Sequence, residues 1–242
     1  MPNLLSVDRY DGFAVVTLQR PEKRNALSID LRVELADAFA ELSADDSLAC
    51  VVLTGAGSAF CAGMDMTQFG GDQDHRRLLV ETSTGAFHAV GRCPKAVVAA
   101  VNGPALAGGF ALALICDIRI ATHTARFGYP ELPRGIPPSY ASTRAVLAPA
   151  AARELCLTGR VIDADEALRL GVVSEVVSDV DLPARAVSLA EEIAALPRAA
   201  VLETKRRILL DAESSWGALF DDEERVFRAA LLEGEELPSA PA

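Results

Sequence analysis

The chain of 242 residues has 50% hydrophobic and 24% charged residues and a formal net charge of −11. Its length allows one domain with a large core, or a core domain with a small appendage. The acidic balance argues against a nucleic-acid partner, because phosphate binding needs a basic patch. The most apolar stretch, 96–120, is broken by polar residues and glycines, so no run reaches the roughly 18 residues of a membrane span.

The N-terminal segment and the cysteines indicate the compartment. Segment 1–8 lacks the basic stretch, apolar run and small-residue cleavage site of a secretory signal. The five cysteines are odd in number, lie in apolar runs and show no CxxC spacing. They are typical of buried thiols, so we expect a cytoplasmic protein without a disulfide or zinc framework.

Hydrophobic patterning predicts a succession of strands, turns and helices along the chain. A hairpin is expected over 4–18, where Asp-Gly at 11–12 suits a tight turn, and Ser28 is expected to cap a helix ending near Ser43. Further strands are predicted over 50–53, 96–101, 117–121 and 172–177, and helices over 76–90, 108–115, 181–195, 198–211 and 214–232, with a helix pair within 151–171. This succession favours right-handed crossovers and a largely parallel sheet.

The fold class predicted from this order is α/β. An α/β core is expected over residues 1–190 and a helical region over 191–242, with a frayed end from 233. The helices of the second region carry larger apolar faces than an appendage needs. We therefore expect them to be buried against the core or against a neighbouring subunit.

Two glycine-rich loops, 55–65 and 102–109, each follow a predicted buried strand. Gly108 and Gly109 begin a predicted helix, where unpaired N–H groups and the helix dipole favour an oxygen that becomes negative. Taken alone, each loop is explained more simply as a tight turn that uses the positive φ of glycine.

Glu131 is the candidate base, because it lies among apolar and proline residues in the segment 127–133. Such surroundings raise the pKa of a carboxyl group and suit proton transfer. Taken alone, a glutamate in a proline-rich loop is more often solvated. The three histidines show no metal-ligand spacing, and we expect neither a metal site nor a nucleophilic triad.

Together, several segments in this order resemble the signature of the crotonase (enoyl-CoA hydratase/isomerase) superfamily. They are 24–27, 60–65, 101–109, 116–118, 127–131 and 157–173, and the resemblance covers about 5–210. It implies a superhelical core of stacked ββα turns with a helical C-terminal trimerisation region. It also implies a homotrimer or a hexamer built as a dimer of trimers, acting on an acyl-CoA thioester with no cofactor beyond the coenzyme A of the substrate.

The resemblance also implies the roles of individual residues. The N–H groups of Met64 and Gly108 would form an oxyanion hole for a thioester enolate, with Glu131 as the base; removing one such donor in other enzymes costs about 10²–10³ in rate. Residues expected along the coenzyme A and substrate path are Arg24, Ala26, Ala62, Gly63, Asp65, Met66 and Gly109. The basic run 205–207 is expected to meet the phosphates, from the same or a neighbouring subunit.

Two departures from the family pattern bear on the reaction. Family hydratases carry a second glutamate in the helix after the Gly-rich turn, and Ala111 stands at that position here. Tyr140 lies where a small glycine-rich stretch is usual; it either lines the acyl pocket or packs as an aromatic with its hydroxyl at the surface. Arg134 either pairs with Glu131 and lowers its pKa, or faces solvent.

Three functions remain open from the sequence. The leading one is a single-base enoyl-CoA isomerase, because a double-bond shift needs only Glu131. The second is a hydratase or another crotonase reaction, such as thioester hydrolysis or decarboxylation, with an unrecognised second group. The third is a non-catalytic acyl-CoA-binding protein. The acyl chain and the choice between trimer and hexamer are left open.

Overall fold

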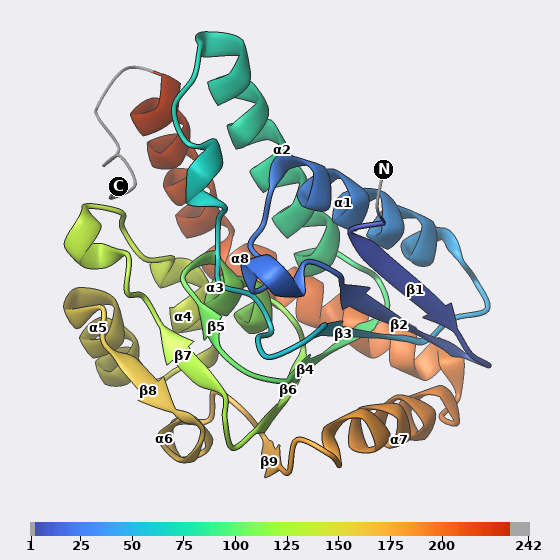
Figure 1. Cartoon of the computed structure of the whole chain (residues 1–242). Helices are drawn as coiled ribbons and strands as arrows, with labels where there is room; N and C mark the ends of the chain where they lie inside the picture. The colour runs from blue at the N-terminus through green and yellow to red at the C-terminus, as the bar shows by residue number, and fades with distance from the viewer. Residues whose placement is uncertain (1–2, 233–242) are drawn as a thin grey trace.

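The computed structural model describes residues 3–232, and the predicted frayed end over 233–242 lies outside them. A six-stranded sheet crosses the molecule (Figure 1) in the order β1 Leu5–Arg9, β2 Phe13–Leu18, β3 Cys50–Gly55, β4 Ala96–Val101, β6 Ile118–Thr122 and β9 Glu175–Val177. The β1 and β2 strands pair antiparallel, and every later pair is parallel. The predicted α/β class is confirmed.

The two faces of this sheet are covered by different helices because side chains alternate along each strand. In β3, Val51 and Leu53 belong to the main core, which includes residues of α1 Ile29–Ala44. The intervening Val52 belongs to a second cluster with Ala186 of α7 Leu182–Ala194. Figure 1 shows α1 and α7 on opposite sides of the sheet.

The described part of the chain also contains a small second sheet and six further α-helices. A small sheet consists of β5 Ala105–Leu106, β7 Arg126–Gly128 and β8 Val161–Asp163. The other helices are α2 Gln73–Gly91, α3 Gly108–Leu114, α4 Tyr140–Val146, α5 Pro149–Thr158, α6 Ala164–Leu170 and α8 Arg198–Leu232. Within residues 3–232, no helix combines the length and apolar character needed to cross a bilayer.

Several local signals act as predicted. Gly12 adopts a φ of 79° in the turn of the hairpin, and the side chain of Ser28 accepts a hydrogen bond from Leu31 N at the start of α1. The predicted helix pair within 151–171 is present as α5 and α6. The predicted boundary between 190 and 191 falls within α7, which packs on the sheet.

One prediction about the elements is wrong, and one predicted strand is too long. The expected separate helices over 198–211 and 214–232 form the single helix α8, because residues 212–213 contain no glycine or proline that would break the hydrogen-bond ladder. The strand expected over 172–177 is restricted to β9, since Val172 and Val173 precede it as buried loop residues. The sequence also gave no indication of β5, β7, β8 and α4.

A buried ion pair ties α8 to the core. Lys205 is 3% exposed, and its ammonium donates to both carboxylate oxygens of Asp117, at 2.7 and 2.6 Å. Asp117 also accepts a hydrogen bond from Val97 N (2.7 Å) near the start of β4. One side chain of α8 is thereby fixed to the loop between α3 and β6.

We expect Lys205→Met to lower the free energy of unfolding by about 3–5 kcal/mol, because it leaves the partly buried carboxylate of Asp117 without its cation. The matched control is Arg207→Met, which removes a cation from the exposed surface of the same helix and should leave the unfolding midpoint unchanged. Urea unfolding followed by circular dichroism checks both. Equal midpoints for the two variants would contradict an anchoring role for Lys205.

Candidate active site

Two loops that follow the neighbouring parallel strands β3 and β4 lie against each other. Cys61 pairs with Ala105 in an isolated bridge, and Leu106 N donates to Cys61 O (3.0 Å). A third segment joins them, because Leu27 N donates to Gly63 O (2.8 Å). The glycine-rich loops identified in the sequence therefore meet in space.

The contact between these loops requires an unusual backbone. Gly63 has a φ of +96°, and a Cβ atom on it would lie 2.8 Å from the Cβ of Ala107. Ala107 itself has a φ of 53°, a region that costs a residue with a side chain about 1–3 kcal/mol. Its N–H donates to Gly128 O (2.9 Å), which holds the strained turn in place. Strain of this kind is typical of functional sites.

Two backbone N–H groups are unpaired where the loops meet. Gly108 is the first residue of α3, so its N–H has no acceptor within the helix. Among residues 3–232, neither this group nor Met64 N donates a hydrogen bond. A Cβ atom built on Gly108 would lie 3.7 Å from Met64 N, so the two donors border the same small space. Such a pair stabilises an oxygen that gains negative charge.

Glu131 is held in an environment that favours its neutral form. It directly precedes the 3-10 helix Leu132–Arg134, and its Oε2 atom is buried without a hydrogen-bond partner among the described residues. Burial raises the pKa of Glu131 to about 7, against the smaller opposing effects of its own backbone N–H and of Arg134. A carboxyl group with this pKa can both accept and return a proton near neutral pH.

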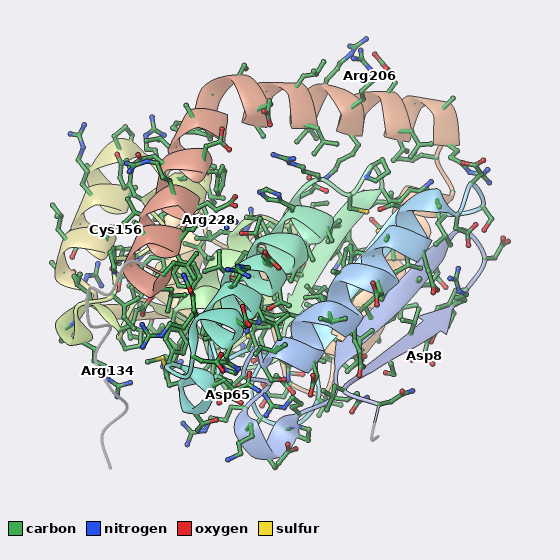
Figure 2. All side chains as sticks on the ribbon, turned by 90° about the horizontal axis from the view of Figure 1, so that it is seen from above. Asp8, Asp65, Arg134, Cys156, Arg206 and Arg228 are labelled. Atoms are coloured by element: carbon green, nitrogen blue, oxygen red, sulfur yellow. The ribbon has the colours of Figure 1, made fainter. Side chains whose placement is uncertain are left out.

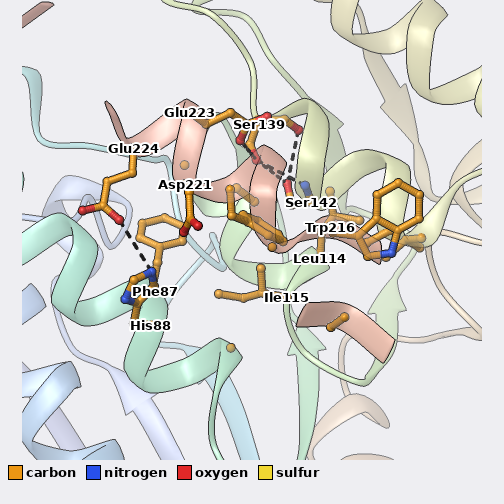
Figure 3. A pocket seen from close by; sticks show the side chains of 18 of the residues that line it. Phe87, His88, Leu114, Ile115, Ser139, Ser142, Trp216, Asp221, Glu223 and Glu224 are labelled. Carbon is orange, nitrogen blue, oxygen red and sulfur yellow. Dashed lines mark hydrogen bonds and ion pairs between the residues drawn. The ribbon is translucent and has the colours of Figure 1, made fainter. Parts of the chain in front are cut away.

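One cavity of about 1340 Å³ contains all three predicted catalytic groups, since Met64, Gly108 and Glu131 line it. Ala111 lines it as well and is 6% exposed. At the position where family hydratases carry their second glutamate, this chain therefore presents only a methyl group to the cavity. Figure 3 shows side chains from α2, α3, α4 and α8 around this hollow. Across residues 3–232, no three His, Cys, Asp or Glu side chains gather as a metal site would require.

One hydrogen-bonded carboxylate of the cavity, that of Glu223, was missed in the sequence. Glu223 of α8 lines the cavity, and its two oxygens accept hydrogen bonds from Ser139 Oγ and Ala141 N, both at 2.7 Å. Burial raises the pKa of Glu223, while these hydrogen bonds act in the opposite direction. The separation of Glu223 from the Glu131 loop in the sequence, and the absence of a motif around it, explain why no pattern indicated it.

Arg20 was also missed, although it fixes the loop that carries Met64. Its guanidinium donates to Asp65 Oδ2 (3.0 Å) and to Ala26 O, and Asp65 also accepts from Thr67 Oγ1 (2.6 Å). Burial acts to raise the pKa of Asp65, but the hydrogen bonds from Thr67 and Arg20 outweigh it and lower the pKa. The side chain of Asp65 therefore serves to hold the loop.

The other residues expected along the coenzyme A path lie beside Met64 but outside the cavity. Ala62 N donates to Arg24 O (3.0 Å), and the bridge between Leu27 and Met64 continues this pairing. Their adjacency agrees with a shared binding path, and coenzyme A contacts for Arg24, Ala26, Ala62, Gly63 and Met66 stay predictions.

Three of the residues considered for ligand contact have a packing or ion-pair role in this structure. Gly109 does not line the cavity; a Cβ atom on it would lie 2.0 Å from Cys61 O, so glycine is required there for packing. Tyr140 is also absent from the cavity lining, because it packs against the main core at the start of α4. Lys205 is committed to Asp117 within its own subunit, so its ammonium is not free for a phosphate.

The neighbouring glycines Gly108 and Gly109 permit a matched test of this geometry. Gly109→Ala should destabilise the fold by about 1–3 kcal/mol or more, because the new methyl group overlaps Cys61 O. Gly108→Ala should fold normally, because the atoms nearest to its methyl group lie at 3.7 Å, but that methyl group occupies the space bordered by the two amides. Thermal melting and calorimetric titration with a saturated acyl-CoA check this. Unimpaired binding by a folded Gly108→Ala variant would contradict the assigned oxyanion hole.

Comparison with known proteins agrees with this geometry. The family described as enoyl-CoA hydratase/isomerase matches residues 8–234. A putative enoyl-CoA hydratase of Thermus thermophilus is 40% identical over 204 residues, covering 81% of this chain and 80% of that protein. A solved enoyl-CoA hydratase/isomerase from Xanthobacter autotrophicus Py2 has a TM-score of 0.87 at 33% identity, covering 98% and 90% of the two chains.

A solved monofunctional enoyl CoA isomerase from M. smegmatis has a TM-score of 0.73 at 35% identity, covering 88% of this chain and 95% of that one. Both solved structures share the crotonase-like fold expected from the signature. The resemblance stated from the sequence is therefore confirmed, and this chain belongs to the enoyl-CoA hydratase/isomerase family and is an enzyme of that family.

Proposed function

We propose that this enzyme is a single-base enoyl-CoA isomerase, which moves a double bond from C3–C4 to C2–C3 of an acyl-CoA thioester. The observation that carries the proposal is Glu131, whose buried carboxyl oxygen has no hydrogen-bond partner among residues 3–232 and which lines the same cavity as Met64 and Gly108. Ala111 stands where family hydratases have their second glutamate. A double-bond shift needs one group that removes and returns a proton, whereas hydration also requires an activated water.

In the proposed mechanism, the thioester carbonyl accepts hydrogen bonds from Met64 N and Gly108 N. The carboxylate of Glu131 takes a proton from C2, and the electron pair of that C–H bond delocalises into an enolate whose oxygen the two amides stabilise. The protonated Glu131 then gives the same proton to C4. The double bond re-forms between C2 and C3, so no atom is gained or lost and no cofactor beyond the coenzyme A of the substrate takes part.

Hydration is the second candidate, because Glu223 provides a carboxylate in the same cavity with a raised pKa. It could hold the water that Ala111 cannot. Both of its oxygens already bind the N-terminal segment of α4, which favours a structural role and keeps isomerisation first. Mass spectrometry of the product distinguishes the two reactions, since hydration adds the mass of one water and isomerisation adds none.

The exposed apolar residues of α8 support a proposed oligomer. Leu219 is 38% exposed on this helix, and Ile208, Leu210 and Val226, which also line the cavity, are between 41% and 56% exposed. Association of subunits would bury part of this surface. We propose a homotrimer or a dimer of trimers in the cytoplasm, where the five free buried thiols would stay reduced. The exposed Arg206 and Arg207 remain candidates for coenzyme A phosphates.

Replacing the proposed base gives the direct test. Glu131→Gln should lower the rate of 3-enoyl-CoA isomerisation by about 10²–10⁴-fold, because the amide cannot take up the proton, while the affinity for a saturated acyl-CoA stays within about twofold. Conjugated-thioester absorbance measures the rate and calorimetry the affinity. The matched control is Glu81→Gln, an exposed glutamate of α2 outside the cavity. Activity in Glu131→Gln that equals the control would show that another group is the base.

The pH dependence of kcat/KM should follow the raised pKa of Glu131. Because the base acts as the carboxylate, kcat/KM should rise with pH through about 7 and level off above it, increasing about tenfold between pH 6 and pH 8. Arg134 acts to lower this pKa, so Arg134→Gln should move the midpoint to higher pH. A profile that is flat, or that falls over this range, would be inconsistent with Glu131 as the base.

A further inference from the structure

The cavity extends well beyond the three catalytic groups, along one face of α3. Gly108, Ala111, Leu114 and Ile115 all line it, and their spacing of three, four and seven residues places them on one side of a helix. We call the surface formed by these four residues the floor of the cavity. It begins at the oxyanion hole and continues to the C-terminal end of α3. Apart from Gly108, every residue of this floor has an aliphatic side chain.

The length of this floor can be compared with that of an acyl chain. From Gly108 to Ile115 the chain advances seven residues, or about 10 Å at 1.5 Å per residue. An extended alkyl chain with C–C bonds of about 1.5 Å advances by roughly 1.3 Å per carbon, so about eight carbons span the floor. A four-carbon acyl group would leave about half of it uncovered.

The side walls and roof next to this floor combine large apolar side chains with charged residues of α8, which include Asp221 and Glu224. Phe87 of α2 and Val146 of α4 line the sides, and Trp216, Phe220 and Phe227 of α8 line the roof. Figure 3 shows Phe87, Leu114, Ile115 and Trp216 around the same hollow, with Asp221 and Glu224 toward one side. At about 1340 Å³, the cavity exceeds the roughly 300–1,000 Å³ of common ligand pockets.

We propose that the natural substrate carries an apolar acyl group of about eight carbons or more, or a ring system of the same length, lying along α3 beneath α8. The proposal rests on the thioester site proposed above, because that site fixes the start of the acyl chain at Gly108. Ala111 takes on a second role, since its small side chain keeps the floor apolar next to the reacting carbons. A short acyl group would leave this apolar surface in contact with water, without the favourable burial that a longer one provides.

Binding of saturated acyl-CoA esters tests the proposal without requiring turnover. Calorimetric titration with butanoyl-, octanoyl- and dodecanoyl-CoA should show octanoyl-CoA binding at least about tenfold more tightly than butanoyl-CoA. Complete burial would contribute up to about fourfold per methylene group. Equal affinities for butanoyl- and octanoyl-CoA would overturn the proposal.

Two variants locate the acyl chain along α3. Ile115→Trp places a bulky ring at the far end of the floor and should reduce the affinity for octanoyl-CoA to about that for butanoyl-CoA. Ala111→Leu obstructs the floor nearer its start and should likewise reduce the affinity for octanoyl-CoA to about that for butanoyl-CoA. It adds less volume than tryptophan, so it keeps the test available if Ile115→Trp does not fold. Ala184→Trp, at an exposed position of α7 remote from the cavity, is the control and should leave the whole series unchanged. Tight octanoyl-CoA binding that survives both α3 substitutions would overturn the proposal.

Failure of the acyl-chain inference can be distinguished from failure of the proposed reaction. Affinity that rises with chain length, without isomerisation of any 3-enoyl-CoA, would support the acyl chamber and overturn the proposed reaction. Isomerisation of 3-butenoyl-CoA with no dependence of binding on chain length would support the reaction and overturn the inference drawn from α3.

Discussion

The close approach of the loops that follow β3 and β4 is the constraint on which the rest of the site depends. Adjacent parallel strands end at the same edge of a sheet, so their loops are neighbours without any long-range search. Bringing the two backbones into contact then excludes a side chain at Gly63 and holds Ala107 at positive φ. The result is a pair of amide donors placed by main-chain packing, which no change of side-chain rotamer can misdirect.

Removal of water gives these donors and Glu131 a common physical setting. Within a cavity of low dielectric, a hydrogen bond to a developing charge is stronger than in water. The same burial disfavours the carboxylate and raises the pKa of Glu131 toward neutrality, with Arg134 limiting the rise. Helix α8 contributes to this exclusion of water by forming one side of the cavity. The low dielectric around the amide donors and the raised pKa of Glu131 therefore have one cause, which is burial in the cavity.

The sequence was informative wherever the cause of a feature lies within a few residues. The cap at Ser28, the turn at Gly12 and the turn leading to Gly108 follow from local chemistry, and each was predicted. The two- and three-residue strands of the small sheet have too few side chains to show a period, and they were missed. The continuity of α8 was also missed, because a helix that bends around the core shows an interrupted apolar pattern without any break in its backbone.

Contacts between residues distant in the sequence were not predictable at all. Arg20 and Asp65, or Glu223 and the first turn of α4, are brought together only by the completed fold. Met64 was assigned from resemblance to a family, whereas Gly108 and Glu131 were already candidates from their own surroundings in the sequence. All three assignments agree with the geometry. The same resemblance placed Gly109 along the ligand path, where the structure shows close packing on Cys61, and Tyr140, left open between pocket lining and packing, packs against the core. A motif identifies which segments meet, but not which side of each segment faces the cavity.

The unbroken helix α8 has a consequence for the exchange of substrate and product. Figure 2 shows it running along the top of the view near Arg206 and then bending downward toward Arg228. It is attached near its beginning by Lys205 and farther along by Glu223, with one continuous hydrogen-bond ladder between them. Because α8 is helical from Arg198 to Leu232, it contains no loop that could act as a hinge for opening the cavity. Widening the cavity under α8 therefore strains both attachments at once, which links the residence time of a bound acyl group to the strength of these two contacts.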